Sequence, residues 1–79
     1  METKTDKDKE VKISARNILE GTIKAIHKGT TITHVEIEIK GGGVITSSIT
    51  NEAVDELGLK VGAKASTVIK ASDVMIAVE

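Results

Sequence analysis

The stretch "TITHVEIEIKGGGVITSSIT", residues 31–50, decides the fold. In its first half every second residue is apolar, at Val35, Ile37 and Ile39, and the positions around them hold histidine, glutamate and lysine. A period of two is typical of a strand with one buried face and one wet face. Three glycines, residues 41–43, then predict a turn, and VITSSIT returns as a second strand. We therefore expect a β-hairpin at the centre of the chain.

Further strands are expected on both sides of this hairpin. Residues 18–28, ILEGTIKAIHK, predict the strand before it, with Gly21 as a bulge or a point where two backbones approach closely. After the hairpin, two short strands are expected at residues 64–71 and 74–78.

One helical pattern interrupts the strands, NEAVDELGL at residues 51–59, with Val54 and Leu57 on one face. Thr50 or Asn51 can cap its start, and Gly58 can end it. Five short strands with one short helix between the third and the fourth predict a mostly β fold, a single small OB-like barrel.

Length and composition predict one small domain that does not stand alone. In residues 1–12 four lysines balance four acidic residues, which predicts a charged, flexible N-terminal tail ahead of a domain at residues 13–79. The chain has no aromatic residue and no cysteine, so neither large side chains nor disulfides complete its core. A domain of this size is marginal by itself. We therefore expect subunits to complete their cores against one another.

The same composition argues against several classes of function. No apolar run approaches the roughly 20 residues of a membrane span, and the charged N-terminus is unlike a signal peptide, so we expect no membrane partner and a cytoplasmic location. With a net charge of −1 and no aromatic platform, the chain is poorly suited to bind nucleic acid. His27 and His34 lack a third ligand at a metal spacing, and Ser47 and Ser48 lack an evident base, so no enzyme is expected.

Three side chains each allow two interpretations. Arg16 in "ISARN" and Lys70 in "TVIKASDVMIAV" are either solvated, with Asp73 as a partner for Lys70, or donors to an anion. Thr50 is either only a helix cap or also part of an anion site at the helix start, where free N–H groups favour negative charge. The residues alone leave these alternatives open.

Three motifs in order carry a resemblance to a known family. SARN before ILEGTIKAI, the ITSSIT and VDELGLKVGA block, and the closing VIKASDVMIAV resemble the molbindins, small Mop-type molybdate-binding proteins built on a Mop or TOBE domain. The resemblance covers residues 13–78. It implies an OB-like barrel, a homo-hexamer built as a trimer of dimers, and molybdate or tungstate held between subunits.

The resemblance also implies a set of ligand-binding residues. A tetrahedral dianion only accepts hydrogen bonds, so its site needs cations and N–H or O–H donors and no nearby carboxylate. Arg16 and Lys70 would supply the charge, and Thr50 would reach in from a neighbouring subunit. The other implied donors are the hydroxyls of Ser14 and Ser72 and the backbone N–H groups around Ala15, Arg16 and Ala71.

A second class of site in the family lies near threefold axes and rests more on the main chain. Its counterpart is expected in HKGTTITH, residues 27–34, where Ile32 and His34 replace the small polar and acidic residues often found in the family. The candidate residues of this second site are His27, Thr31, Thr33 and His34, the last as a pH-dependent donor.

The function implied is non-enzymatic binding and storage of molybdate or tungstate in the cytoplasm. The alternative is an oligomeric regulatory or effector module for a molybdate transporter or regulator, without a storage role. No helix-turn-helix or P-loop segment fits into 79 residues, which we take to favour a stand-alone binder.

Overall fold

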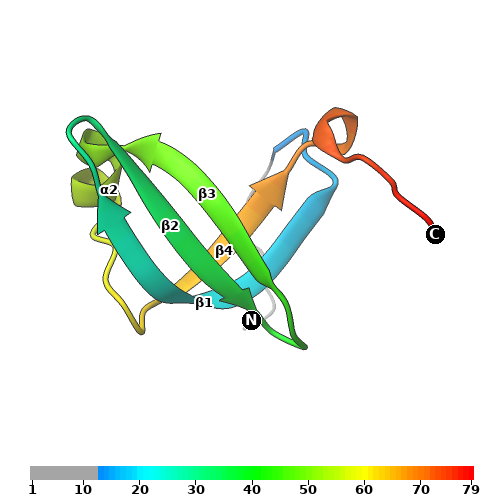
Figure 1. Ribbon diagram of the computed structural model, residues 1–79, viewed down its shortest axis with the longest axis horizontal. Helices are drawn as coiled ribbons and strands as arrows, with labels where there is room; N and C mark the ends of the chain where they lie inside the picture. Colours follow the sequence, from blue (N-terminus) through cyan, green and yellow to red (C-terminus); the bar gives the residue numbers. More distant parts are fainter. Residues whose placement is uncertain (1–12) are drawn as a thin grey trace, which may run out of the picture.

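The computed structural model describes residues 13–79, so the predicted tail, residues 1–12, lies outside the described residues. One antiparallel sheet has the strand order β3-β2-β1-β4. Figure 1 shows it curled into half of a barrel, with a helix at one end and a short 3-10 turn at the other. The elements are β1 (Asn17–Lys28), β2 (Ile32–Ile39), β3 (Val44–Thr50), the helix α2 (Asn51–Leu57), β4 (Lys64–Ile69) and the 3-10 turn η1 (Ala71–Asp73). The mostly β fold and the place of the helix are confirmed.

The central hairpin forms as its pattern predicts. Thr33, Val35 and Ile37 of β2 are 0%, 1% and 5% exposed, and the residues between them are exposed or half-buried. The turn at Gly41–Gly43 has φ angles of +98°, +116° and +96°, which residues with a side chain rarely adopt. Buried alternation on one strand and glycine in the turn together hold β2 against β3.

Gly21 is a point of close approach, but the irregularity in β1 lies elsewhere. A Cβ atom at Gly21 would lie 2.5 Å from the carbonyl oxygen of Glu38 and 2.8 Å from the Cγ2 atom of Ile37. The regular pairing of β1 with β2 shifts between Ile23 and Ala25. The predicted close approach is therefore confirmed, whereas the bulge lies at Lys24.

Helix α2 is capped at both ends. The Thr50 Oγ1 atom accepts a hydrogen bond from the Ala53 N–H at 3.1 Å, and Gly58 ends the helix in the left-handed region with a φ of 63°. Val54 is 5% exposed, but Leu57 is 68% exposed, so only one of the two apolar residues expected on the inner face is buried.

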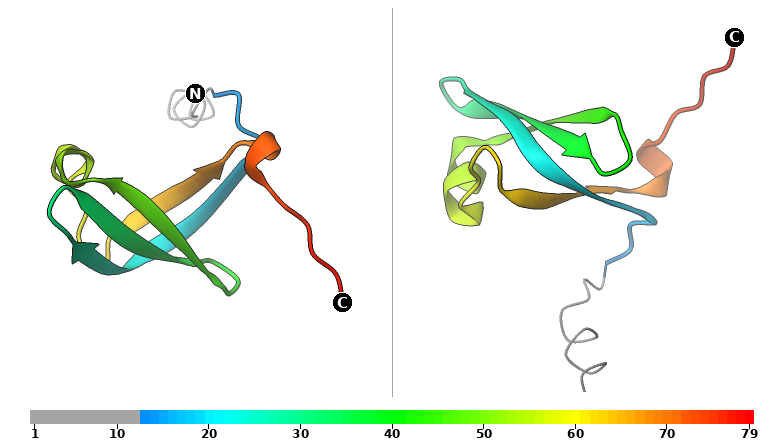
Figure 2. Two further views of the ribbon diagram at one scale, coloured as in Figure 1. Left: turned by 45° about the horizontal axis from the view of Figure 1, so that its top comes forward. Right: turned by 90° about the horizontal axis from the view of Figure 1, so that it is seen from below.

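The fifth strand expected at residues 74–78 does not form within the described chain. Residues 74–79 pair with no strand of the sheet, and Met75, Ile76 and Val78 are 93%, 89% and 90% exposed. β4 ends at Ile69, before the expected end at residue 71, because η1 turns the chain away. Figure 2 shows the C-terminal segment leading away from the sheet in both views. The four strands therefore make an OB-like barrel that is open on one side.

The buried core is small for a domain of this length. Its apolar residues that are buried are Ile23, Val35, Ile37 and Val54. Half-buried residues such as Ile49 and Leu59 extend it toward the open side. No helix within residues 13–79 has the length and apolar character to cross a bilayer.

Candidate anion-binding site

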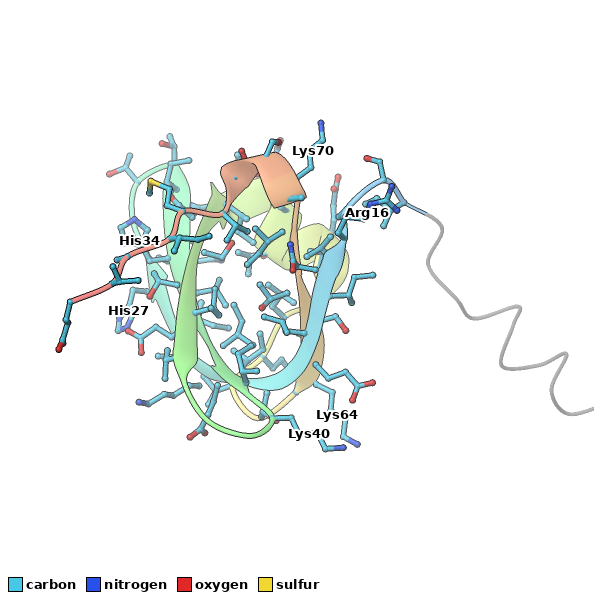
Figure 3. All side chains as sticks on the ribbon, turned by 90° about the vertical axis from the view of Figure 1, so that its right-hand side faces the viewer. Arg16, His27, His34, Lys40, Lys64 and Lys70 are labelled. Atoms are coloured by element: carbon cyan, nitrogen blue, oxygen red, sulfur yellow. The ribbon has the colours of Figure 1, made fainter. Side chains whose placement is uncertain are left out.

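The pairing of β1 with β4 brings two of the three candidate segments together. Asn17 pairs with Ile69, and the Asn17 Nδ2 atom donates to the Ile69 carbonyl oxygen at 3.1 Å. In an antiparallel ladder, the residues just before one partner lie beside the residues just after the other. Figure 3 shows Arg16 and Lys70 at this same end of the molecule. Residues 14–16 and 70–72 therefore form one corner of the sheet, which we call the basic corner.

The two cations of the basic corner have no acidic partner within residues 13–79. Arg16 and Lys70 are both exposed, and neither forms an ion pair with a described residue. Asp73 does not pair with Lys70 through its side chain; its backbone N–H donates to the Lys70 carbonyl oxygen at 2.8 Å. Two cationic side chains at one corner of the sheet, neither of them in an ion pair with a described residue, can attract an anion.

Hydroxyl donors flank these cations. Ser14 and Ser72 are exposed, and their side chains form no hydrogen bond with another residue of the described part of the chain. A serine hydroxyl carries one O–H donor that can turn toward a ligand. Ala15 is half-buried and Ala71 is exposed, and each can contribute only its backbone to a site. The basic corner can therefore offer both charge and O–H donors to one small anion.

Thr50 does not belong to the basic corner of its own chain. It ends β3 and caps α2, whereas Asn17 and Ile69 lie at the other end of the sheet (Figure 1). β1 has 12 residues, each advancing about 3.3 Å, so the two ends are tens of ångströms apart along the strand. The Thr50 Oγ1 atom accepts from Ala53, which leaves its O–H as a donor. Thr50 can therefore serve only the basic corner of another chain.

The two histidines lie opposite each other across the hairpin of β1 and β2. His27 and His34 are direct pairing partners on β1 and β2, and Figure 3 shows them on the side away from Arg16. The His27 Nε2 atom lies 3.4 Å from the Glu36 Oε2 atom. A carboxylate so close to His27 repels an oxyanion, so these histidines form a poorer anion site than the basic corner does.

The threonines proposed for the second site serve a hydrogen-bond network around Asn51. The buried Thr33 hydroxyl donates to the Asn51 Oδ1 atom. The Asn51 Nδ2 atom donates to the carbonyl oxygens of Gly29 and Thr30 at 3.1 Å and 3.2 Å. The backbone N–H of Asn51 donates to the carbonyl oxygen of Thr31 at 2.9 Å. Sequence reasoning treated Asn51 only as a possible cap, although asparagine is also favoured where a side chain must hold a turn.

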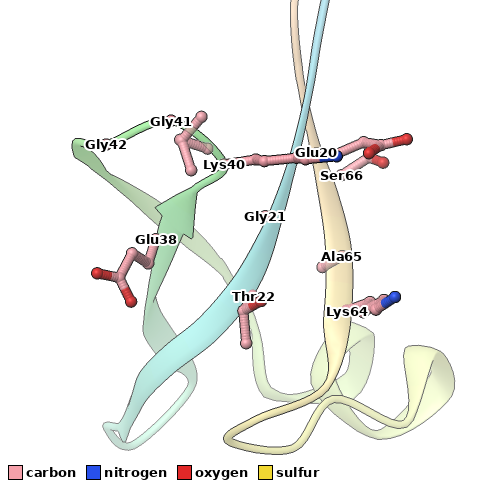
Figure 4. Close-up of a pocket in the computed structure, with 11 residues that line it drawn as sticks. Glu20, Gly21, Thr22, Glu38, Lys40, Gly41, Gly42, Lys64, Ala65 and Ser66 are labelled. Carbon is pink, nitrogen blue, oxygen red and sulfur yellow. The ribbon is translucent and has the colours of Figure 1, made fainter.

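A wide cleft lies away from the basic corner. It has a volume of about 890 Å³ and lies beside the glycine turn, β1 and the start of β4. Figure 4 shows Lys40 pointing across to Glu20 and Ser66, whereas Glu38 and Lys64 point to opposite sides. Because two glutamates offset two lysines, the cleft offers a dianion no net charge. Nor does any group of three or more histidine or acidic side chains in residues 13–79 lie in a position to hold a metal ion.

Comparison with known proteins gives consistent matches. Residues 13–76 match the TOBE domain family. Molybdenum-pterin-binding protein 1 of Clostridium pasteurianum is 50% identical over 64 residues, which are 81% of this chain and 94% of that protein. MopII from Clostridium pasteurianum has a similar structure, with a TM-score of 0.79 at 46% identity over 85% of this chain and 100% of MopII. ModG, described as a cytoplasmic molybdate-binding protein and solved with molybdate bound, gives a TM-score of 0.79 at 55% identity over 82% of this chain and 46% of the ModG chain.

Proposed function

Because the chain belongs to the TOBE domain family, we propose that it binds molybdate or tungstate at the basic corner and stores the oxyanion in the cytoplasm, without catalysing a reaction. The family resemblance predicted from the three motifs is confirmed. The observation that supports the proposal is the pairing of β1 with β4, which brings Arg16 and Lys70 to one corner of the sheet, where neither forms an ion pair with another of residues 13–79.

The chemistry of the basic corner suits a tetrahedral dianion. The Arg16 guanidinium is a planar fork of N–H donors, and the Lys70 ammonium adds a compact positive charge. A cation and a unit negative charge about 4 Å apart attract each other by roughly 4 kcal/mol at an effective dielectric constant of about 20. The hydroxyls of Ser14 and Ser72 can donate to the remaining oxygens of the ligand. Thr50 of a neighbouring subunit adds a further donor.

A homo-hexamer, assembled as a trimer of dimers, is the proposed working form. Besides the C-terminal segment, several large apolar side chains remain exposed on the single chain, including Ile18 at 45%, Val44 at 44% and Val68 at 43%. Contact between chains would remove this area from water. Because Thr50 and the basic corner lie at opposite ends of the sheet, a site that includes Thr50 needs at least two chains.

Calorimetric titration with molybdate and tungstate tests this function. We expect Arg16→Ala and Lys70→Ala each to weaken binding by about 2 to 5 kcal/mol, which is about 30-fold to several thousand-fold, because each leaves a desolvated dianion short of one cation. Arg16→Lys keeps the charge and loses the fork, so its loss should be intermediate.

Lys64→Ala is the matched control, since it removes an exposed lysine that lines the cleft and not the basic corner. Its affinity should equal that of the wild type. Unchanged affinity in both Arg16→Ala and Lys70→Ala would overturn the proposed site, and a loss confined to Lys64→Ala would move the ligand to the cleft.

A further inference from the structure

Both histidines of the chain lie on one exposed part of the sheet. His27 and His34 are direct partners in the pairing of β1 with β2. Side chains of directly opposite residues in an antiparallel pair share one face, with their Cβ atoms about 5 Å apart. Figure 3 shows both histidines on the outside of the half barrel, on the side away from Arg16. The two imidazole rings are therefore close enough to bind the same ion.

A carboxylate lies beside these rings. Glu36 follows His34 by two residues on β2, so their side chains share a face of the sheet. The Glu36 Oε2 atom is 3.4 Å from the His27 Nε2 atom, which is longer than the usual limit of about 3.2 Å for an N–H···O hydrogen bond. Two ligand atoms that each lie about 2.1 Å from one metal ion, at a tetrahedral angle, are about 3.4 Å apart. The spacing of this pair therefore suits two ligands of a metal ion.

The three side chains are not all in position at once. Within residues 13–79 no group of three or more histidine or acidic side chains is placed to hold a metal ion. His27 and His34 are exposed, and exposed side chains change rotamer within nanoseconds. A turn of the His34 ring toward His27 and Glu36 completes a set of two imidazole nitrogens and one carboxylate oxygen. Because the two histidines are direct partners, this turn needs no movement of the backbone.

The backbone that carries the two histidines is held in place. The Gly29 N–H donates to the Ile32 carbonyl oxygen at 2.8 Å, which closes the turn between β1 and β2. The Asn51 side chain donates to the carbonyl oxygens of Gly29 and Thr30 at 3.1 Å and 3.2 Å. Ligands on a fixed backbone lose less freedom when an ion binds. The end of this hairpin is therefore a suitable base for a metal site.

The charges around the histidines favour a cation. Besides Glu36, Glu38 lies on the same face of β2 and is exposed. The Lys28 Nζ atom, beside His27 in the sequence, lies 3.5 Å from the Asp55 Oδ1 atom, which offsets the charge of this lysine. Imidazole nitrogen together with carboxylate oxygen is a ligand set that suits Zn²⁺, Cu²⁺ and Ni²⁺. The same carboxylates that repel an oxyanion attract such an ion.

We propose that His27, His34 and Glu36 of one chain bind a divalent transition-metal ion, of the class of Zn²⁺, Cu²⁺ and Ni²⁺, on the outer face of β1 and β2. Three protein ligands leave at least one position on the ion open to water, so the ion binds reversibly. This site takes a cation and lies away from the basic corner, so it goes beyond the proposed function and does not depend on it.

Calorimetric titration with Ni²⁺, in a buffer without molybdate, phosphate or chelators, tests this site. The wild-type protein should bind one Ni²⁺ per chain. His27→Ala and His34→Ala should each weaken binding by at least about tenfold, because the second ligand of a chelate binds at a high effective concentration. Glu36→Gln should cause a smaller loss, since both imidazoles remain. All three side chains are at least partly exposed, so circular dichroism should show an unchanged fold.

A variant with the same number of histidines is the matched control. His27→Ala combined with Lys40→His keeps two histidines, but position 40 lies six residues from His34, about 20 Å along the chain. This variant should bind Ni²⁺ no more tightly than His27→Ala alone. Wild-type affinity in both alanine variants, or a wild-type protein that binds no more tightly than they do, would overturn the site. One Ni²⁺ for every two chains would also overturn it, because the ion would then lie between histidines of different chains.

Discussion

Thr50 can cap helix α2 and can also donate a hydrogen bond to a ligand, and the variant Thr50→Asp tests these two roles separately. In the wild-type chain the Thr50 Oγ1 atom accepts the Ala53 N–H at 3.1 Å, and its O–H is free to donate to a ligand. An aspartate caps a helix about as well as a threonine does. It cannot donate when ionised, and it adds a negative charge. We therefore expect Thr50→Asp to fold normally and to lose oxyanion binding.

The size of this loss follows from the charges. A unit negative charge about 5 Å from a dianion is repelled by roughly 1.5 to 6.5 kcal/mol, as the effective dielectric constant falls from about 80 to about 20. Even the smaller value weakens binding about tenfold. Thr50→Val keeps the shape of the side chain but cannot cap the helix, so it should lower the free energy of unfolding by about 1 kcal/mol. It also removes one hydrogen-bond donor to the ligand. Thr50→Ser keeps both roles and is the control.

Two measurements on the three variants separate the roles. Urea unfolding followed by far-ultraviolet circular dichroism reports stability, since the chain has no aromatic residue for fluorescence. Calorimetric titration with molybdate reports binding. Wild-type affinity in Thr50→Asp would refute the argument, because no subunit could then place Thr50 against the ligand.

Three further predictions concern the scaffold. Gly21→Ala should lower the free energy of unfolding by about 1 to 3 kcal/mol, because the new Cβ would lie 2.5 Å from the Glu38 carbonyl oxygen; unchanged urea unfolding would contradict this contact. Asn51→Ala should cost about 1 to 3 kcal/mol and speed amide hydrogen exchange in Gly29–Thr31, since it leaves the buried Thr33 hydroxyl unpaired; normal exchange would argue against the network. Removing residues 1–11 should leave oligomer size and oxyanion affinity unchanged by size-exclusion chromatography and calorimetry, and a clear loss of binding would show that this segment contributes to a site.

Features that depend on neighbouring residues were predictable from the sequence. The alternation of Val35 and Ile37 with polar residues predicted the buried face of β2, because side chains on a strand point to opposite faces in turn. Thr50 and Gly58 predicted the ends of α2 for equally local reasons. The shift in β1 at Lys24 was not predictable, since it depends on how β1 pairs with β2 and leaves no mark in the residues themselves.

The C-terminal segment, residues 74–79, shows the limit of strand prediction. Its apolar run predicted a fifth strand at residues 74–78, and the chain is indeed extended there, but no edge of the described sheet receives it. A strand pattern shows that a segment needs a partner edge and does not say on which chain that edge lies. The residues of the basic corner were easier to predict than its geometry. The motifs SARN and VIKASDVMIAV contain Arg16 and Lys70, but only the pairing of Asn17 with Ile69 shows that the two lie at the same corner of the sheet.

If Thr50 and the basic corner of a neighbour form the proposed site, their separation within one chain sets how many oxyanions an assembly can hold. Each chain offers one basic corner and one Thr50, at opposite ends of its sheet, so the two serve different sites. In a closed, symmetric assembly every basic corner meets the Thr50 of a neighbour, and the capacity at this kind of site is one oxyanion per chain. An open-ended row leaves a basic corner unfilled at one end and a Thr50 unused at the other. The stoichiometry of saturation therefore reports whether the assembly closes on itself.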